Sequence, residues 1–483
     1  MTRRATTSSA PISQAQGFNF QSLDWGRLTA EAGDLLRELF PICRSLTGDG
    51  VRQTLRRLKA VVPIEIDEIA SGEECYDWRV PDEWNIRDAY VATADGERVV
   101  DFRRSNLHVV GYSVPLDAEM SFAELDPHLH SLPALPTAIP YRTSYYERNW
   151  GFCLTHQAYQ QLDRGARYRV VIDSTLAPGS LTYGQARLAG RSGREFLIST
   201  YCCHPSLAND NLSGVVLWAL LLRELQSQPT WHSYRFVIVP ETIGAIAYLH
   251  RHEAAMRRVE AGMVVTTVAG PGKTGCKQSF LGDHLIDRAV RRSFQEAGLE
   301  PIVYPFDING SDERQYSSPH FRIPIATITK DKYYEYPYYH TSLDDLTFVQ
   351  PESLVETLQL YLRTIAMLEA DRVCRSTIPQ SEPMLGKRGL YPQMGGSIRQ
   401  TAAEQAASPA EREYVVSEGR IARGSELDAI RWLMFWGDGR TTIFEIAERT
   451  GLPVGQLVEV AARLVEHGLL KPAAAPRRRS GTA

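Results

Sequence analysis

The stretch FLISTYCCHPSLANDNLSG, residues 196–214, contains an apolar strand, a loop and the start of an apolar helix. The β-rich segment 196–203 ends in His204, and a turn of small residues follows. Asn209-Asp210-Asn211 then precedes a helix predicted over 212–225. Ligands of open α/β sheets bind outside the carboxyl ends of the strands, so His204 and Asp210 are predicted to face that crevice. Taken alone, Asp210 would more often be a helix cap.

Strands alternate with helices around this stretch, which predicts an α/β fold with a mostly parallel, doubly wound sheet. The other predicted strands are 168–173, 234–239, 263–268 and 323–329, and the predicted helices are 212–226, 245–258, 284–298 and 351–370.

The chain has 483 residues, too many for one ordinary domain. Short β runs separated by Pro81-Asp82 and Asp95-Gly96 indicate a small all-β unit. The predicted organisation is a disordered tail (1–20), an α/β domain in two pieces (21–63 and 141–374), an inserted β domain (64–140), a linker (375–413), a winged-helix domain (414–471) and a second tail (472–483).

The composition is that of a globular protein, with 43% hydrophobic and 23% charged residues. A net charge of −4 argues against a protein that coats nucleic acid or anionic membranes. The sequence has neither a transmembrane stretch nor a secretory h-region, and its seven scattered cysteines suit the reducing cytoplasm. No cysteines form a CxxC pair, which disfavours a thiolate zinc site.

Four candidate metal ligands follow predicted strands. His204 and Asp210 follow the first, Glu241 follows YRFVIVP, and His340 comes after the 323–329 strand and its loop. Two histidines and two carboxylates suit Zn²⁺ better than Mg²⁺ or Ca²⁺. Zinc-bound water can attack an amide carbonyl near neutral pH.

Each of these residues also has a structural interpretation. His340 could be a buried structural histidine, and Glu241 could cap the helix that starts near Ile243. Asp344 and Asp345 are expected to be helix-approach charges or partners of ligands. The shared sheet edge and the order along the chain favour a site.

Four motifs resemble those of the M28-type co-catalytic zinc aminopeptidases, in the same order along the chain. They are HPSLANDNLSG (204–214), PETIGAIAYL (240–249), GSDERQY (310–316) and YYHTSLDDL (338–346). DWRVPDEWNIRDAY, NLHVVGYSVP and LFPICRSLTGDGVR are similar to a bacterial aminopeptidase-like group, the DUF4910/DUF2172 type, with an inserted β domain and a C-terminal winged helix. The resemblance covers about residues 30–470.

The resemblance implies a role for each matching residue. His204 matches the histidine of the first metal site and Asp210 the aspartate that bridges two metals. Glu241 matches a ligand of the second metal, and His340 matches its closing histidine. Tyr339 lies where relatives use a tyrosine to stabilise the oxyanion.

The chain departs from the family pattern at three positions. Pro240 occupies the position of the general base, Thr266-Thr267 ends a strand where an aspartate is usual, and Pro205-Ser206 replaces the orienting aspartate after His204.

Asp210, Glu241 and His340 still complete a trio for one zinc ion, with His204 as a ligand or as a partner of one; two ions are the alternative. The base is then Glu241, if it does not bind metal, or an acidic residue of the 311–313 loop, Asp312 or Glu313.

The sequence thus predicts a cytoplasmic zinc hydrolase that cleaves an amide bond in a small peptide or an aminoacylated metabolite. The alternative is an inactive scaffold or binding protein in a polysaccharide or secondary-metabolite pathway. A transcription regulator is the third hypothesis. It is disfavoured because residues 411–470 hold ten acidic residues against seven Arg and no Lys, so a winged helix that contacts protein or dimerises fits better than one that binds DNA.

Aromatic residues offer a further hypothesis about the substrate. Trp78, Trp84 and Trp150 form either the core of the β unit or a face that binds sugar or another substrate. The tyrosines of 333–339 line the cleft or pack a loop.

Overall fold

The computed structural model describes residue 20 and residues 22–391 and 426–473. The chain divides into two compact units, one formed by residues 23–364 and the other by the residues after 364 together with the first 22. The predicted tails and most of the predicted linker lie outside the described residues.

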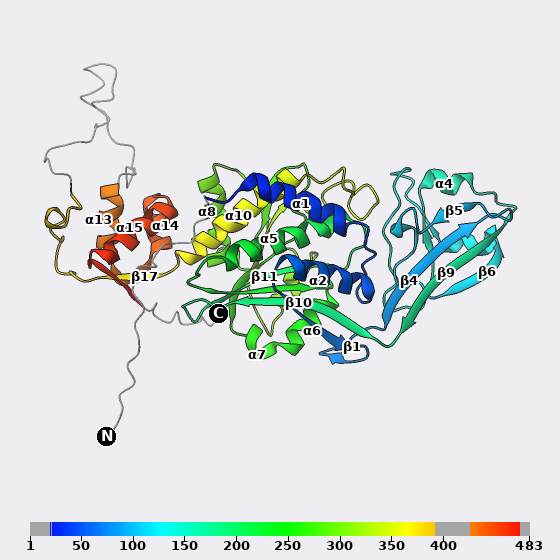
Figure 1. The fold of residues 1–483 in the computed structure, drawn as a ribbon, viewed down its shortest axis with the longest axis horizontal. Coiled ribbons are helices and arrows are strands. Elements are labelled where there is room, and N and C mark those ends of the chain that lie inside the picture. The colour runs from blue at the N-terminus through cyan, green and yellow to red at the C-terminus, as the bar shows by residue number, and fades with distance from the viewer. Residues whose placement is uncertain (1–19, 21, 392–425, 474–483) are drawn as a thin grey trace, which may run out of the picture. The chain divides into compact units, whose positions relative to one another are not determined.

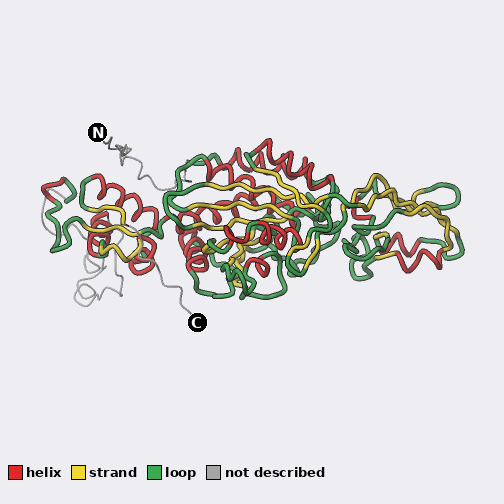
Figure 2. Tube along the Cα trace, turned by 90° about the horizontal axis from the view of Figure 1, so that it is seen from below, coloured by secondary structure: helices red, strands yellow, loops and turns green. Residues whose placement is uncertain are grey.

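An eight-stranded mixed sheet forms the centre of residues 23–364 (Figures 1 and 2). Its four central strands pair in parallel, whereas both edges contain antiparallel pairs, so the sheet is less uniformly parallel than predicted. β10 pairs antiparallel with both of its neighbours, β1 and β12, and β14 pairs antiparallel with β16. In sheet order the strands are β1 (Glu65–Ala70), β10 (Ser180–Leu188), β12 (Ser233–Val239), β11 (Glu195–Tyr201), β13 (Val259–Val264), β16 (Ile325–Lys330), β14 (Thr274–Lys277) and β15 (Ile302–Tyr304).

Helices cover this sheet. In Figure 1, α1 (Trp25–Leu39), α5 (Gly214–Gln226) and α10 (Pro351–Glu369) lie above the strands, and α6 (Ile243–Arg251) and α7 (Glu253–Met256) lie below. Almost every residue of α5 is buried, since the helix packs on β11 and is itself covered by α1. The remaining helices of this part are α2 (Asp49–Val61), α8 (Leu285–Ala297) and α9 (Glu313–Tyr316).

The inserted β elements form a four-stranded antiparallel sheet with the order β5-β4-β9-β6 (Figure 1). Its strands are β4 (Glu83–Ala92), β5 (Arg98–Asp101), β6 (Leu116–Ser121) and β9 (Arg167–Ala177). The insert therefore extends beyond the predicted end at residue 140, and the strand expected over 168–173 in the α/β domain belongs to it. Conversely, β1 pairs with β10 in the main sheet. Shorter elements are β2 (Glu74–Cys75), β3 (Trp78–Arg79), α3 (Phe122–Leu125), β7 (Leu129–His130), β8 (Phe152–Cys153) and α4 (His156–Gln161).

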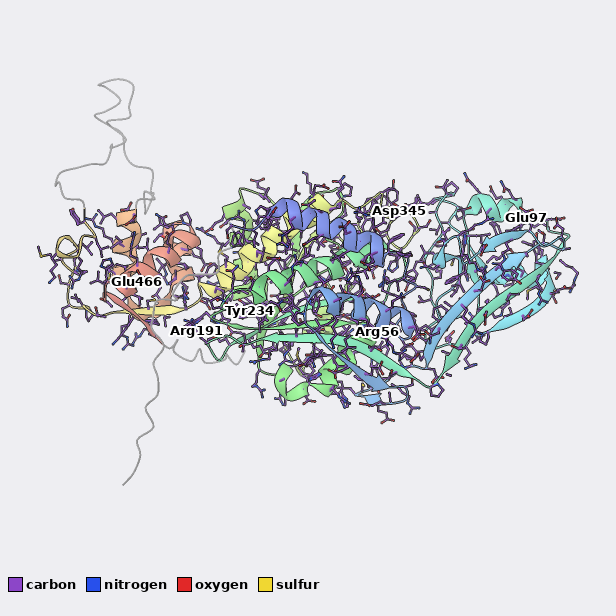
Figure 3. The ribbon with its side chains drawn as sticks, viewed as in Figure 1. Arg56, Glu97, Arg191, Tyr234, Asp345 and Glu466 are labelled. Atoms are coloured by element: carbon purple, nitrogen blue, oxygen red, sulfur yellow. The ribbon has the colours of Figure 1, made fainter. Side chains whose placement is uncertain are left out.

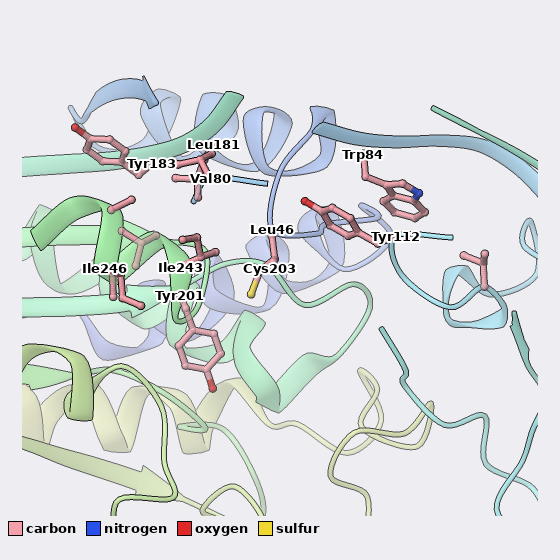
Figure 4. Close-up of a cluster of buried hydrophobic side chains, with 14 of the residues drawn as sticks. Leu46, Val80, Trp84, Tyr112, Leu181, Tyr183, Tyr201, Cys203, Ile243 and Ile246 are labelled. Carbon is pink, nitrogen blue, oxygen red and sulfur yellow. The ribbon is translucent and has the colours of Figure 1, made fainter. Parts of the chain in front are cut away.

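One hydrophobic cluster joins the insert to the main sheet (Figure 4). Trp84 and Tyr112 stack at its insert side, and Tyr201 and Cys203 belong to it at the carboxyl end of β11. Trp84 is therefore core, as one of the two hypotheses predicts, whereas Trp78 is 41% exposed and does not fit that hypothesis. Charged side chains such as Arg56, Glu97 and Arg191, labelled in Figure 3, are exposed.

In the described part of the C-terminal unit, helices pack with a three-stranded antiparallel sheet. The elements are α13 (Glu426–Phe435), β18 (Asp438–Thr442), α14 (Ile443–Thr450), α15 (Val454–Glu466) and β19 (Leu470–Ala473), with β17 (Val373–Ser376) as the middle strand. β17 lies before residue 414, where the predicted winged-helix domain begins. The small sheet therefore includes a strand from outside the predicted domain.

Among the described residues, no helix is both long and apolar enough to span a bilayer.

Candidate metal centre

The centre of the site is the carboxyl end of β11, a central strand with parallel neighbours on both sides. The backbone leaves the strand at Cys202, and His204 and Asp210 follow as buried residues, 5% and 1% exposed. The Asp210 carboxylate bonds to side chains rather than to the N-terminal amides of α5. The helix-cap interpretation of Asp210 therefore does not hold.

Three of the predicted ligands converge. Asp210 Oδ2 lies 3.0 Å from His340 Nε2 and 4.0 Å from His204 Nε2. The ligand atoms of these three residues, which we call the first trio, lie within 4.8 Å of one another. Asp210 Oδ2 and His340 Nε2 are buried and have no partner with hydrogen-bond geometry. A buried carboxylate oxygen and an imidazole nitrogen that lack such partners fit the lining of a cation site.

The charge states suit a cation. Burial lowers the pKa of His204 to about 4, so its imidazole is neutral at pH 7 and has a lone pair to offer. Burial by itself would raise the pKa of Asp210, but His204, His340 and the Tyr201 hydroxyl outweigh it and lower that pKa to about 2. Two imidazoles and one carboxylate are a ligand set typical of zinc.

The other oxygen of Asp210 is occupied. Tyr201 donates its hydroxyl hydrogen to Asp210 Oδ1 at 2.6 Å and lies 2.8 Å from the Thr266 hydroxyl. Thr266 stands at the strand end where the family pattern has an aspartate. Tyr201 and Thr266 thus fill the space beside Asp210 Oδ1, and Oδ2 is the oxygen that faces the two histidines.

The fourth predicted ligand, Glu241, also lies close to His204. It follows β12, and its Oε2 is 3.9 Å from His204 Nε2. Ser311 donates to Glu241 Oε1 at 2.8 Å, and the Glu241 amide donates to Cys203 Sγ at 3.3 Å. Burial and then the charge of Asp210 raise the pKa of Glu241 to about 7. A carboxylate with this pKa is suited to accept a proton near neutral pH.

A second trio shares His204 with the first. Cys203, His204 and Glu241 also place one ligand atom each within 4.8 Å of one another. The structure therefore groups Glu241 with Cys203, whereas Asp210 and His340 are grouped with His204. This favours His204 as a ligand, one of the two roles predicted for it.

The two acidic residues of the 311–313 loop are engaged elsewhere. Asp312 is buried and accepts the Thr242 amide at 2.7 Å; burial and the charge of Glu241 raise its pKa well above the usual range. Glu313 accepts bonds from Lys277 at 2.5 Å and Tyr333 at 2.6 Å. Glu241 Oε2 lies 3.9 Å from His204 Nε2, whereas Glu313 forms an ion pair with Lys277.

The loop after β16 carries His340 and Tyr339. The two rings stack with centroids 3.9 Å apart. Burial and then the charge of Asp210 raise the pKa of Tyr339, so its hydroxyl keeps its proton and remains a donor.

Asp344 fixes the segment that holds Asp210. Its two oxygens accept the amides of Asn209 and Asp210 at 2.6 and 3.0 Å, and Tyr336 donates to it at 2.9 Å. This is the role of ligand partner that the sequence suggested for Asp344. Asp345 instead accepts bonds from Thr347 and Phe348 in its own turn.

Sequence reasoning missed three residues around the histidines. The Tyr141 ring lies 5.2 Å from the His204 ring and 5.1 Å from the His340 ring. Tyr201 and Arg44 are the others; buried Arg44 donates Nε–H to the His204 carbonyl at 2.9 Å. Arg44 belongs to the quoted LFPICRSLTGDGVR motif, which was the only available signal.

The sequence and the fold were compared with known proteins. The model of the family described as a domain of unknown function, DUF4910, matches residues 33–371. A protein of Clostridium acetobutylicum is 40% identical over 91% of this chain and 96% of its own length. Its provisional name is polysaccharide biosynthesis protein with an aminopeptidase-like domain.

Solved structures show the same fold. A crystal structure from Clostridium acetobutylicum, provisionally described as a peptidase, is 37% identical, with a TM-score of 0.82 over 93% of this chain and 97% of that one. BSAP, a zinc aminopeptidase from Bacillus subtilis, is 12% identical, with a TM-score of 0.53 over 72% of this chain and 95% of that one. The chain thus has an aminopeptidase-like fold, as the motif resemblance implied.

Proposed function

The chain belongs to the DUF4910 family, and from its aminopeptidase-like fold and site we propose that it is a zinc-dependent hydrolase of amide bonds. The observation that carries the proposal is the first trio, whose buried Asp210 Oδ2 and His340 Nε2 lie 3.0 Å apart, beside a carboxylate whose pKa is about 7. Small peptides with a free amino terminus, or aminoacylated metabolites, are the proposed substrates.

His204, Asp210 and His340 would hold one zinc ion. Three protein ligands and an open position are the usual arrangement of catalytic zinc, which supplies an acidified water and polarises a carbonyl. One ion rather than a pair is supported by Thr266, which stands at the strand end where the family pattern has a further aspartate ligand.

Glu241 is the proposed general base. Ser311 holds its Oε1, so Oε2 is the oxygen left to accept a proton from the attacking water. After attack, the same oxygen can return the proton to the leaving amine. Tyr339 is proposed to donate a hydrogen bond to the carbonyl oxygen as negative charge develops there.

The site itself gives the first test. Zinc per chain is measured by elemental analysis on protein purified without added metal, together with His340→Ala and a control, His320→Ala. His320 is half-exposed and pairs with Glu253. We expect about one zinc ion in the wild type and the control, and little in His340→Ala. A wild type that holds no zinc and gains none on titration would contradict the proposal.

A scaffold without catalysis is the second candidate. Pro240 at the usual base position and Thr266 at the usual ligand position favour it, as does the relative's provisional assignment to polysaccharide biosynthesis. Hydrolysis of aminoacyl anilides by the zinc-loaded protein, and its loss in Glu241→Gln, distinguishes the two candidates.

The proposal extends to location and partners. A cytoplasmic enzyme whose C-terminal unit contacts protein, or a second copy of the chain, rather than DNA fits the acidic balance of residues 411–470.

A further inference from the structure

The second trio is preformed for a different kind of ion. Cys203 is 1% exposed, and its Sγ lies 3.5 Å from His204 Nδ1. The Glu241 amide donates to the same sulfur at 3.3 Å, so the backbone of one member orients the side chain of another. Hydrogen bonds of this kind fix metal ligands in place.

The first trio lacks one ligand of the family pattern. Asp210 Oδ1 accepts the Tyr201 hydroxyl, and Oδ2 lies 3.0 Å from His340 Nε2. The position of the usual strand-end aspartate holds Thr266, which also faces Tyr201. Among the described residues, the only other group of this kind is Cys203, His204 and Glu241.

Sulfur changes the preference of that group. Thiolate ligands select soft ions, whereas carboxylate and imidazole suit harder ones. The absence of CxxC spacing disfavours a site built from paired cysteines. It does not bear on a single cysteine whose partners are an adjacent histidine and a glutamate that follows the neighbouring strand.

We propose that Cys203, His204 and Glu241 form a second cation site, selective for a thiophilic ion such as Cd²⁺. Binding replaces the thiol proton of Cys203, which passes to solvent. The ion also takes Glu241 as a ligand and so withdraws it from proton transfer. This last consequence rests on the proposed function; the site itself does not.

Cadmium titration tests the site. Metal-free protein receives CdCl₂ without oxygen, and the sulfur-to-cadmium charge-transfer absorption is followed in wild type, Cys203→Ser, Cys202→Ser and His340→Ala. Cys202 is the matched control, since it is equally buried but belongs to neither trio. The half-buried Cys43 and Cys374 contribute the same background to all four proteins.

We expect the charge-transfer absorption to rise until one equivalent of cadmium is bound in wild type, Cys202→Ser and His340→Ala. In Cys203→Ser this rise should be absent. Identical titrations of Cys203→Ser and wild type would overturn the site. His340 belongs to the first trio only, so His340→Ala should still bind cadmium through Cys203. The cadmium result therefore tests the second site even if the zinc proposal is wrong.

A second measurement uses only the wild type, so its result does not depend on the folding of any variant. X-ray absorption at the cadmium edge, with one equivalent bound, should give one sulfur among nitrogen and oxygen neighbours. A shell without sulfur overturns the site. Once a substrate is known, cadmium should inhibit wild type at least about tenfold more strongly than Cys203→Ser; equal inhibition overturns the withdrawal of Glu241.

Discussion

At the scale of single residues, the Glu241 side chain has different contacts from those of the proposed zinc ligands His204, Asp210 and His340. Its carboxylate contacts Ser311 and approaches His204, but it is not grouped with Asp210 and His340. If it is the base, Glu241→Gln should keep its zinc and lose about 10²- to 10⁴-fold in kcat. Zinc analysis and initial rates on the same preparation check both. Loss of zinc along with activity would instead mean that Glu241 is a ligand.

The pKa of Glu241 predicts a pH effect on stability in the metal-free protein. Burial and Asp210 raise this pKa from 4.5 to about 7. Between those values the folded state holds a proton that the unfolded state has lost, so the free energy of unfolding falls as pH rises. Glu241→Gln lacks this contribution. Urea denaturation of both proteins from pH 4.5 to 8 should show wild type losing stability relative to the variant, and a constant difference would contradict the assignment.

Asp344 and Asp345 form a natural pair for comparison. Asp344 accepts the amides of Asn209 and Asp210, whereas Asp345 accepts bonds within its own turn. Asp344→Asn should therefore weaken zinc binding about 10- to 100-fold, and Asp345→Asn should leave it unchanged. Competition with a chromophoric chelator measures both affinities. Equal affinities in the two variants would show that Asp344 does not position Asp210.

At the scale of elements, the start of α2 depends on a glycine. A Cβ at Gly50 would stand 2.0 Å from the Cys43 carbonyl oxygen, a backbone atom that cannot swing away. Gly50→Ala should destabilise residues 23–364 by about 1–3 kcal/mol or more. Gly26 in α1 is the control, because its nearest atom is a side-chain oxygen at 3.5 Å, and Gly26→Ala should stabilise by about 0.4–1 kcal/mol. Chemical denaturation of both variants checks the signs.

Elements were predictable from sequence where periodicity and end signals agree. The apolar run of β11 and the apolar helix after it form as expected, because both are buried on all sides. Pairing direction was harder. The strand near 168–173 forms as β9, but it pairs with β4 and β6 in the insert, since pairing depends on partners distant in sequence.

At the scale of the whole molecule, metal removal should act on one unit. Residues 23–364 contain both trios, and the C-terminal unit has its own helices and sheet. A ligand present at 100 times its Kd stabilises the state that binds it by about 2.7 kcal/mol. Calorimetry with zinc and then with EDTA should show two transitions, of which EDTA lowers only one. A shift of both by the same amount would mean that the units unfold together.

The candidate site shows how far sequence reaches across the molecule. His204, Asp210 and His340 could be predicted because each follows a strand of one sheet, and parallel strands end at a common edge. Tyr141 and Tyr201 could not be assigned in this way. Tyr141 comes after the predicted β domain, and the bond of Tyr201 to Asp210 depends on the path of the intervening loop.

The insert and the main sheet meet beside His340. The Tyr141 amide donates to the His340 carbonyl at 2.8 Å, and the Ser342 amide donates to the Ile139 carbonyl at 2.8 Å. The segment around residue 140 therefore supports the backbone at His340, a predicted metal ligand. In evolutionary terms, the insert cannot be lost or replaced independently of the site. A descendant without it would need other residues to support the backbone of His340 at the same time.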